Sequence, residues 1–162
     1  VVKAPVGASP GVGERVMWHA DISGQGVLSE YTTIANFAVT PVPDDITPQD
    51  AATLPCAGLT AIFALDKIQI KQGDLFFVDG GAGAVGQYAI QLAKKRGAIV
   101  YASASKKNHA LLQKLGAEMA FDYHEEDFSQ HVQQQIGQTQ FDAVLDTMGG
   151  DNTARNIEMM RF

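Results

Sequence analysis

Four glycines fall within the nine residues VDGGAGAVG (78–86), which join an apolar run to a segment of helical pattern. Glycine is costly to order and weak in helices, so a cluster at the start of a helix needs a physical reason. Gly81, Gly83 and Gly86 form the pattern G-x-G-x-x-G. This pattern predicts a tight turn at Gly81, open backbone at Gly83 and close packing of helix on strand at Gly86.

Apolar runs and helical segments alternate from residue 48 onward. We expect helices over residues 85–96, 106–117, 125–136 and 152–160, and strands in LFFV (75–78), AIVYA (98–102), MAFDY (119–123) and FDAVLDTMGG (141–150). Continuous apolar runs indicate strands that are buried on both faces, as in parallel sheets covered by helices. A complete doubly wound dinucleotide fold has about six strands. The pattern therefore predicts an α/β fold, a Rossmann-like doubly wound parallel sheet that is incomplete.

The first part of the chain has a different pattern. Short strand patterns in ERVMWHA (14–20) and SEYTTI (29–34) lie between turn signals, and TPVPDDITPQD (40–50) contains three prolines and three aspartates. Proline and aspartate are frequent in turns and connectors. We therefore expect residues 1–47 to be the C-terminal part of a β-rich domain with its linker, and residues 48–162 to be the dinucleotide-binding domain. We also expect that the chain lacks the start of the first domain and the last strands of the second.

Charge and cysteine content exclude several classes of protein. The net charge of the 162 residues is −6, whereas proteins that bind nucleic acids or membrane surfaces are basic. We therefore expect neither nucleic acid nor membrane as a partner. The single cysteine, Cys56, rules out an intramolecular disulfide and fits a reducing compartment. No apolar run approaches the roughly 18 residues of a membrane span, so the expected location is cytoplasmic.

A phosphate group would explain glycines at the start of a helix. The helix N-terminus offers unpaired N–H groups and the positive end of its dipole to an anion. Gly81, Gly83, Ala84, Val85 and Gly86 are therefore predicted to hold the pyrophosphate of a dinucleotide. Two alternatives stay open: a turn without a ligand, and another nucleotide-like ligand such as S-adenosylmethionine.

The residue about 20 positions after the motif distinguishes NAD from NADP sites. NAD-binding folds carry Asp or Glu there, which holds the ribose 2′-hydroxyl, and here the position is Ser103. A carboxylate would repel the 2′-phosphate of NADP, and serine removes that barrier. Lys106 and Lys107 follow at the start of a helix, where cations oppose the dipole unless an anion is present. Ser103, Ser105 and the two lysines are therefore predicted to hold a 2′-phosphate, which favours NADPH over NADH.

Six motifs occur in the order of one known family. They are GERV (13–16), SEYTTI (29–34), AATLPCAGLTA (51–61), GAGAVGQYAIQLAKKRGA (81–98), LLQKLGA (111–117) and DAVLDTMGG (142–150). Through them the chain resembles the medium-chain dehydrogenase/reductase superfamily, and most of all its zinc-independent, quinone oxidoreductase-like branch. The resemblance implies an NADPH-dependent oxidoreductase that transfers a hydride to a small molecule, a quinone or an α,β-unsaturated carbonyl (enone). It also implies that residues 1–47 are the remnant of a GroES-like catalytic domain and that the intact protein is a homodimer.

The resemblance assigns roles to single residues. Thr60 of GLT would face the phosphate or ribose on the nicotinamide side, and Tyr123 would contact the adenosine end. As an alternative, Tyr123 is an aromatic residue at a strand end without a ligand. The lysine with which the family binds phosphate falls at Asn108, one residue after Lys107. One residue turns a helical side chain by about 100°.

Cys56 lies where zinc alcohol dehydrogenases of this superfamily carry one zinc ligand. A catalytic zinc needs three protein ligands, and none of the four histidines matches the other ligands of that family. Zinc is therefore disfavoured, and Cys56 is predicted to be a small buried hydrophobe. His124 and His131, beside the acidic residues 125–127, are interpreted as a solvated helix face rather than a metal site.

The sequence contains no G-x-S-x-G, H-E-x-x-H or C-x-x-C motif, and these motifs mark common nucleophiles and metal sites. Hydride transfer needs none of them, because the cofactor carries the chemistry. No catalytic residue is assigned, and this chain by itself is expected to be inactive. Two other functions stay open: a zinc-dependent alcohol dehydrogenase, and a non-catalytic dinucleotide-binding sensor or structural protein.

Overall fold

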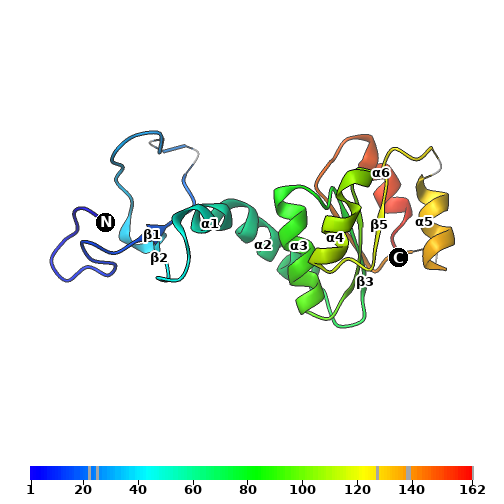
Figure 1. The fold of residues 1–162 in the computed structure, drawn as a ribbon, viewed down its shortest axis with the longest axis horizontal. Coiled ribbons are helices and arrows are strands. Elements are labelled where there is room, and N and C mark those ends of the chain that lie inside the picture. Colours follow the sequence, from blue (N-terminus) through cyan, green and yellow to red (C-terminus); the bar gives the residue numbers. More distant parts are fainter. Residues whose placement is uncertain (22, 25, 127, 138–139, 162) are drawn as a thin grey trace. The chain divides into compact units, whose positions relative to one another are not determined.

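The computed structural model describes residues 1–21, 23–24, 26–126, 128–137 and 140–161 (Figure 1). The chain divides into two units, Val1–Cys56 and Ala57–Phe162. Residues 48–56, expected in the dinucleotide-binding domain, thus belong to the first unit, together with the helix that follows the linker.

The first unit has little regular structure. Strand β1 (Val16–Met17) pairs antiparallel with β2 (Thr40–Pro41), and η1 (Asn36–Ala38) is a 3-10 turn. The strand predicted in ERVMWHA is thus two residues long. The strand predicted in SEYTTI is wrong, because residues 29–34 form bends and irregular chain. β-Branched residues favour a strand where a neighbouring strand pairs with them, and none of the described strands pairs with this segment.

A helical run follows the linker. Helix α1 (Pro48–Thr53) begins where Oγ1 of Thr47 accepts a hydrogen bond from the N–H of Asp50 at 3.1 Å, and proline at the first position is a common start of helices. The run continues through a π-helical turn, η2 (Leu54–Gly58), into α2 (Leu59–Ile68). The chain is thus helical from Pro48 to Ile68.

The run Pro48–Ile68 is long and apolar enough, by length and composition, to cross a membrane, with a mean hydropathy of 1.3 in its most apolar window. The expectation that no segment approaches the length of a membrane span therefore does not hold for this run. Ala61 and Leu65 of this run are fully buried in the core of the second unit. Core helices of globular proteins have the same composition, and 28% of the most apolar window of this run is buried inside the protein.

A four-stranded parallel sheet forms the centre of the second unit (Figure 1). Its strands are β3 (Leu75–Asp79), β4 (Ile99–Ser103), β5 (Met119–Phe121) and β6 (Ala143–Asp146), in the order β5-β4-β3-β6. The predicted α/β fold with a Rossmann-like parallel sheet is confirmed. Since β3 pairs with β4 on one side and with β6 on the other, the strand order changes direction at β3, and α/β sheets bind ligands at such a point.

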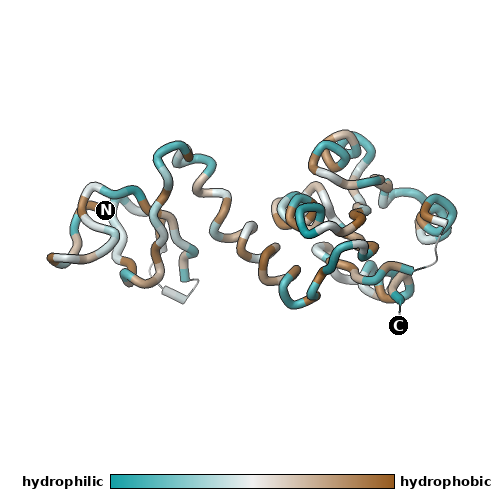
Figure 2. The backbone as a smooth tube through the Cα atoms, turned by 90° about the horizontal axis from the view of Figure 1, so that it is seen from below, coloured by the Kyte–Doolittle hydropathy of each residue, from teal (hydrophilic) through white to brown (hydrophobic). Residues whose placement is uncertain are grey.

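Helices cover both faces of this sheet. They are α2, α3 (Ala84–Lys95), η3 (Lys106–Asn108), α4 (His109–Leu115), α5 (Phe128–Ile136) and α6 (Asp151–Glu158). Leu65 of α2 and Ile90 of α3 share one buried cluster with Phe76, whereas Phe128 of α5 packs with Phe77 in a second cluster. Adjacent residues of β3 thus face opposite layers. Figure 2 shows the matching alternation of hydrophobic and hydrophilic residues along the helices.

Candidate dinucleotide site

The glycine motif forms the turn between β3 and α3. Gly80 has φ = +83°, a left-handed backbone that glycine adopts without strain, so the tight turn expected at Gly81 lies one residue earlier. Gly81 is required by packing instead, because a Cβ there would lie 2.8 Å from Cβ of Ala102 and 3.0 Å from Leu112. Its N–H donates to the main-chain oxygen of Ser103 at 2.8 Å.

The start of α3 packs directly on this turn. A Cβ on Gly86 would lie 2.5 Å from the carbonyl oxygen of Gly80 and 2.8 Å from Cα of Gly81, so the close packing expected at Gly86 is present. Gly83 precedes the helix in extended conformation, and among the described side chains none caps the helix start and none in its first turn is acidic. The N–H groups at the start of α3 are therefore open to an anion.

A pocket of about 380 Å³ opens beside this turn, at the carboxyl ends of β3 and β6. It is lined by Gly80, Ala82, Gly83, Ala84, Val85, Gly86, Ala104, Ser105, Asn108, Tyr123, Thr147 and Met148. The lining includes these residues of the predicted site: Gly83, Ala84, Val85, Gly86, Ser105 and Tyr123. Five predicted residues are not among the described lining: Thr60, Gly81, Ser103, Lys106 and Lys107.

Ser103 lies beneath the pocket rather than on its wall. Its side chain is fully buried. The hydroxyl donates to Oδ1 of Asp79 and accepts the N–H of Gly80 at 2.9 Å. The prediction that the Ser103 side chain contacts a 2′-phosphate therefore does not agree with this geometry, because its hydroxyl is already used inside the protein.

The segment after β4 supplies the next part of the pocket wall. Nδ2 of Asn108 donates to Oγ of Ser105 at 3.2 Å, and both residues line the pocket. Lys106 and Lys107 are exposed on η3, the turn that joins these two residues. The structure thus places Asn108 on the wall and Lys107 outside it, as the offset in the sequence indicated.

Two further predicted residues lie in different surroundings. Tyr123 lines the pocket and is 41% exposed, with its ring centroid 4.3 Å from that of His124. Thr60 is exposed on α2. The pocket therefore unites the glycine turn with Tyr123, and Thr60 stands apart from it.

The loop after β6 forms the opposite wall. Asp146 accepts hydrogen bonds from the N–H groups of Met148 at 2.9 Å and Gly149 at 2.8 Å, and from the hydroxyl of Thr153 at 2.8 Å. Burial raises the pKa of Asp146, but these hydrogen bonds outweigh it and hold the pKa below its ordinary value. The carboxylate thus fixes the loop that brings Met148 to the pocket.

Sequence reasoning did not assign Thr147 and Met148 to the site. The signal was available, because FDAVLDTMGG was predicted as a strand that ends in glycines. In parallel sheets the loops after neighbouring strands meet at one edge. Applying that rule to the last strand would have placed these residues beside the glycine turn.

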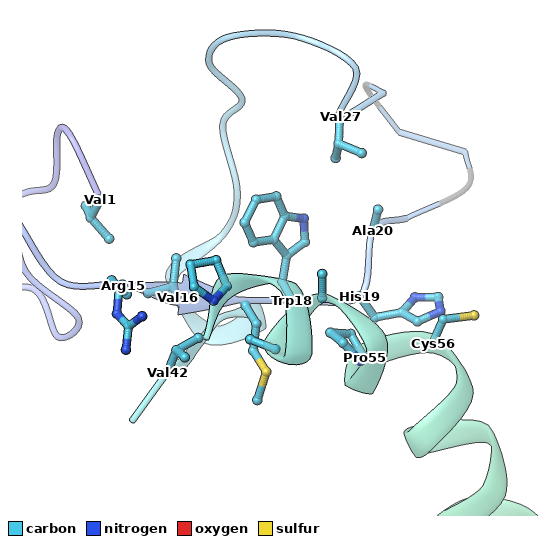
Figure 3. A pocket seen from close by; sticks show the side chains of 14 residues that line it. Val1, Arg15, Val16, Trp18, His19, Ala20, Val27, Val42, Pro55 and Cys56 are labelled. Carbon is cyan, nitrogen blue, oxygen red and sulfur yellow. The ribbon is translucent and has the colours of Figure 1, made fainter. Parts of the chain in front are cut away.

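A second cavity, of about 770 Å³, lies within the first unit. Figure 3 shows Trp18, His19, Pro55 and Cys56 among its lining residues. Cys56 is exposed, so the prediction that it is a buried hydrophobe is wrong. Nε1 of Trp18 is buried without a hydrogen-bond partner among the described atoms.

His124 and His131, interpreted from the sequence as part of a solvated helix face, make separate contacts. Nδ1 of His131 lies 2.8 Å from Oε2 of Glu125, and both side chains are exposed by more than two-fifths. The ring of His124 is tilted by 48° against that of Tyr123, and Asp127 lies outside the described residues. Within the described parts of the chain, no three His, Cys, Asp or Glu side chains gather in a way that could hold a metal ion.

The chain matches the family described as zinc-binding dehydrogenase over residues 84–162. The trans-enoyl reductase tazE of Aspergillus terreus is 37% identical over 137 residues, which cover 75% of this chain and 45% of that protein. The quinone oxidoreductase structure from Coxiella burnetii superposes with a TM-score of 0.86 at 39% identity, over 93% of this chain and 46% of that one.

A third relative was solved with a cofactor. The quinone oxidoreductase of Thermus thermophilus, described also as its complex with NADPH, superposes with a TM-score of 0.75 at 33% identity, over 84% of this chain and 44% of that one. The chain thus spans less than half the length of these relatives. Among the described residues, Cys56 is not grouped with two further His, Cys, Asp or Glu side chains that could hold a metal with it.

Proposed function

Because the chain belongs to the quinone oxidoreductase-like branch of the medium-chain dehydrogenase/reductase superfamily, we propose that it binds the nicotinamide dinucleotide of an NAD(P)H-dependent oxidoreductase. One observation carries the proposal. The glycine turn, the uncapped start of α3 and a pocket of about 380 Å³ meet at the switch point between β3 and β6. An anionic ligand with an extended shape fits this combination.

In this proposal the start of α3 binds the pyrophosphate. The N–H groups of Ala84, Val85 and Gly86 offer hydrogen bonds to phosphate oxygens, and Gly83 lets the ligand approach the backbone. The loop of Thr147 and Met148 covers the ligand from the β6 side.

We propose that the adenosine ribose lies against Ser105, Asn108 and Tyr123, all of which line the pocket. None of the described lining residues carries a carboxylate, so a 2′-phosphate meets no like charge there. Lys106 and Lys107 are close in the chain and exposed. NADPH is therefore favoured over NADH, and the NADPH complex of the Thermus relative supports the choice.

The reaction proposed for the whole protein is reduction of a quinone or an enone. The support comes from the relatives, which are quinone oxidoreductases and trans-enoyl reductases. The bound cofactor supplies the hydride. The part of the reaction assigned to this chain is to bind and orient the dinucleotide, and none of its side chains is given a catalytic role.

The test is a titration of NADPH and NADH into the 162-residue chain at low and high salt. We expect tighter, salt-sensitive binding of NADPH. The variant Asn108→Asp puts a carboxylate on the pocket wall and should weaken NADPH about tenfold while leaving NADH nearly unchanged.

Gln113→Glu is the matched control for this variant, because it makes the same charge change on the exposed surface of α4. Binding of neither dinucleotide would overturn the proposal. Equal responses of Asn108→Asp and Gln113→Glu would remove Asn108 from the site.

A further inference from the structure

We propose that Asp79, Ser103 and Arg155 are positioning residues of the dinucleotide site. They are not among the described residues that line the pocket, yet they hold the backbone of Gly80, which does. The inference rests on the proposed function for its ligand, whereas the hydrogen bonds that carry it belong to the protein alone.

Asp79 is the centre of a buried polar group at the end of β3. Its side chain is 1% exposed. Oδ1 accepts the hydroxyl proton of Ser103, and Oδ2 accepts hydrogen bonds from Nη2 of Arg155 at 2.8 Å and Nδ2 of Asn156 at 2.9 Å. Both oxygens are therefore engaged, which is the condition under which a buried carboxylate is tolerated.

Ser103 links Asp79 to the glycine turn by hydrogen bonds. A hydroxyl can donate one hydrogen bond, and that of Ser103 donates to Asp79. A lone pair of Oγ therefore accepts the N–H of Gly80 at 2.9 Å. The main-chain oxygen of Ser103 accepts the N–H of Gly81 at 2.8 Å. One residue of β4 thus holds two consecutive N–H groups of the turn, and the acceptor Asp79 decides which way its hydroxyl points.

Gly80 has little freedom to move without changing the pocket. Its backbone is left-handed, and a Cβ there would collide with Oγ1 of Thr147 and lie 3.0 Å from Sδ of Met148. Oγ1 of Thr147 donates to the main-chain oxygen of Asp79 at 2.7 Å. The main chain of Asp79 therefore joins the glycine turn to the loop after β6, and residues of both segments line the pocket.

Arg155 connects this group to more distant parts of the unit. It comes from α6, its side chain is 20% exposed, and its guanidinium carbon lies 4.3 Å above the ring centroid of Phe128 at the start of α5. The ring holds the cation in place, and the cation balances the buried carboxylate. A helix that does not line the pocket thus acts on the glycine turn through Asp79 and Ser103.

The opposite end of the same sheet offers a matched control. Nη1 of Arg161 lies 3.2 Å from Oδ1 of Asp142, and Oδ2 of Asp142 accepts the N–H of Leu75 at 2.8 Å. The residue types and the contact to a strand backbone are the same. This pair lies at the amino end of β3, away from the pocket, and is more exposed, so its loss should leave the Gly80 amide and NADPH binding unchanged.

The experiment compares Ser103→Ala, Asp79→Asn and Arg155→Met with Asp142→Asn and Arg161→Met in the 162-residue chain. The NADPH dissociation constant is measured under conditions in which each variant is folded, and the hydrogen-exchange rate of the Gly80 amide is measured without ligand. The first three variants should weaken NADPH about tenfold, the effect of one lost buried hydrogen bond. They should also accelerate exchange of the Gly80 amide, whereas the two controls should change neither quantity.

Ser103→Ala keeps the test decisive if Asp79→Asn does not fold, because it removes one oxygen and leaves the ion pair intact. Unchanged Gly80 exchange and unchanged NADPH affinity in Ser103→Ala would overturn the inference. If the unaltered chain binds neither NADPH nor NADH, the proposed function fails. The exchange rates then decide by themselves whether these residues position the turn.

Discussion

At the amino ends of the strands in the second unit, Asp142 pairs with Arg161, and both side chains reach solvent. At the carboxyl ends, Asp79 pairs with Arg155, and the carboxylate is buried. The chemical groups are the same, but their surroundings differ. At the carboxyl ends the pair is enclosed between β4, α5 and α6 and is tied to a pocket wall.

Glycines show the same contrast. Gly73, before β3, and Gly80, after it, both have positive φ. A Cβ on Gly73 would meet nothing within 4 Å, whereas one on Gly80 would meet the loop after β6. Helix N-termini gather at the carboxyl edge of a parallel sheet, so their N–H groups and dipoles act there. The site thus depends on where the topology places these residues, more than on which residues they are.

The largest effect is expected from Gly86→Ala, compared with Gly73→Ala. The new methyl group in Gly86→Ala would press on the backbone of Gly80 and Gly81, which should lower the free energy of unfolding by about 3 kcal/mol and abolish NADPH binding. Gly73→Ala meets only the cost of its positive φ, about 1 kcal/mol. Urea unfolding and NADPH titration measure both. Equal losses in the two variants would contradict the difference between the two ends.

Next in size is Asp79→Asn, compared with Asp142→Asn. In Asp79→Asn an NH₂ group replaces one of the two carboxylate oxygens to which Ser103, Arg155 and Asn156 donate, so at least one of these hydrogen bonds is lost and Arg155 loses its counter-charge. We expect a loss of about 2–3 kcal/mol in the free energy of unfolding. The partly exposed Asp142 pair should contribute less than about 1 kcal/mol. A larger loss in Asp142→Asn would reverse our interpretation of the two pairs.

A smaller effect is expected from Asp146→Asn in acid. Because the pKa of Asp146 is lowered in the folded protein, its contribution to stability is present above the unfolded pKa of about 3.9 and is lost as the pH falls through the lower folded pKa. The free energy of unfolding of Asp146→Asn should therefore fall less than that of the unaltered chain between about pH 5 and pH 2. Parallel curves for the two proteins would show that the loop hydrogen bonds do not stabilise the charged form.

The smallest effect is expected from Lys107→Ala, compared with Lys114→Ala. Both lysines are exposed, but Lys107 lies before the start of α4 and Lys114 in its last turn, toward the amino end of the sheet. Lys107→Ala should weaken NADPH about threefold and reduce the salt dependence of binding, with NADH unaffected. Lys114→Ala serves as the control. The same weakening in both would mean that only net charge matters.

Local patterns were sufficient to predict much of the second unit. Buried strands appear as unbroken apolar runs such as LFFV, and G-x-G-x-x-G marks the turn. Ser103 was interpreted as a pocket residue because it occupies the place where NAD-binding folds carry an acid. Its hydroxyl turns inward because it donates a hydrogen bond to Asp79, and the local sequence pattern does not indicate this contact between neighbouring strands.

Other features depend on contacts distant in sequence. Arg155 of α6 donates to Asp79, which lies 76 residues earlier in the chain. No spacing in the sequence indicates that pair. The strand predicted in SEYTTI is wrong for a similar reason, because a strand needs a partner that the local sequence does not reveal. The exposure of Cys56 likewise depends on what surrounds it and not on its apolar neighbours in the chain.

The most direct test of the central claim, that the carboxyl end of this sheet binds a dinucleotide, is a two-dimensional amide NMR spectrum of the chain with and without NADPH. We predict that the amide signals of Gly83, Val85, Ser105 and Asn108 shift on addition of NADPH, and that the signal of Gly73 at the amino end stays in place. Shifts confined to the amino end or to the first unit, or no shifts at all, would contradict the claim.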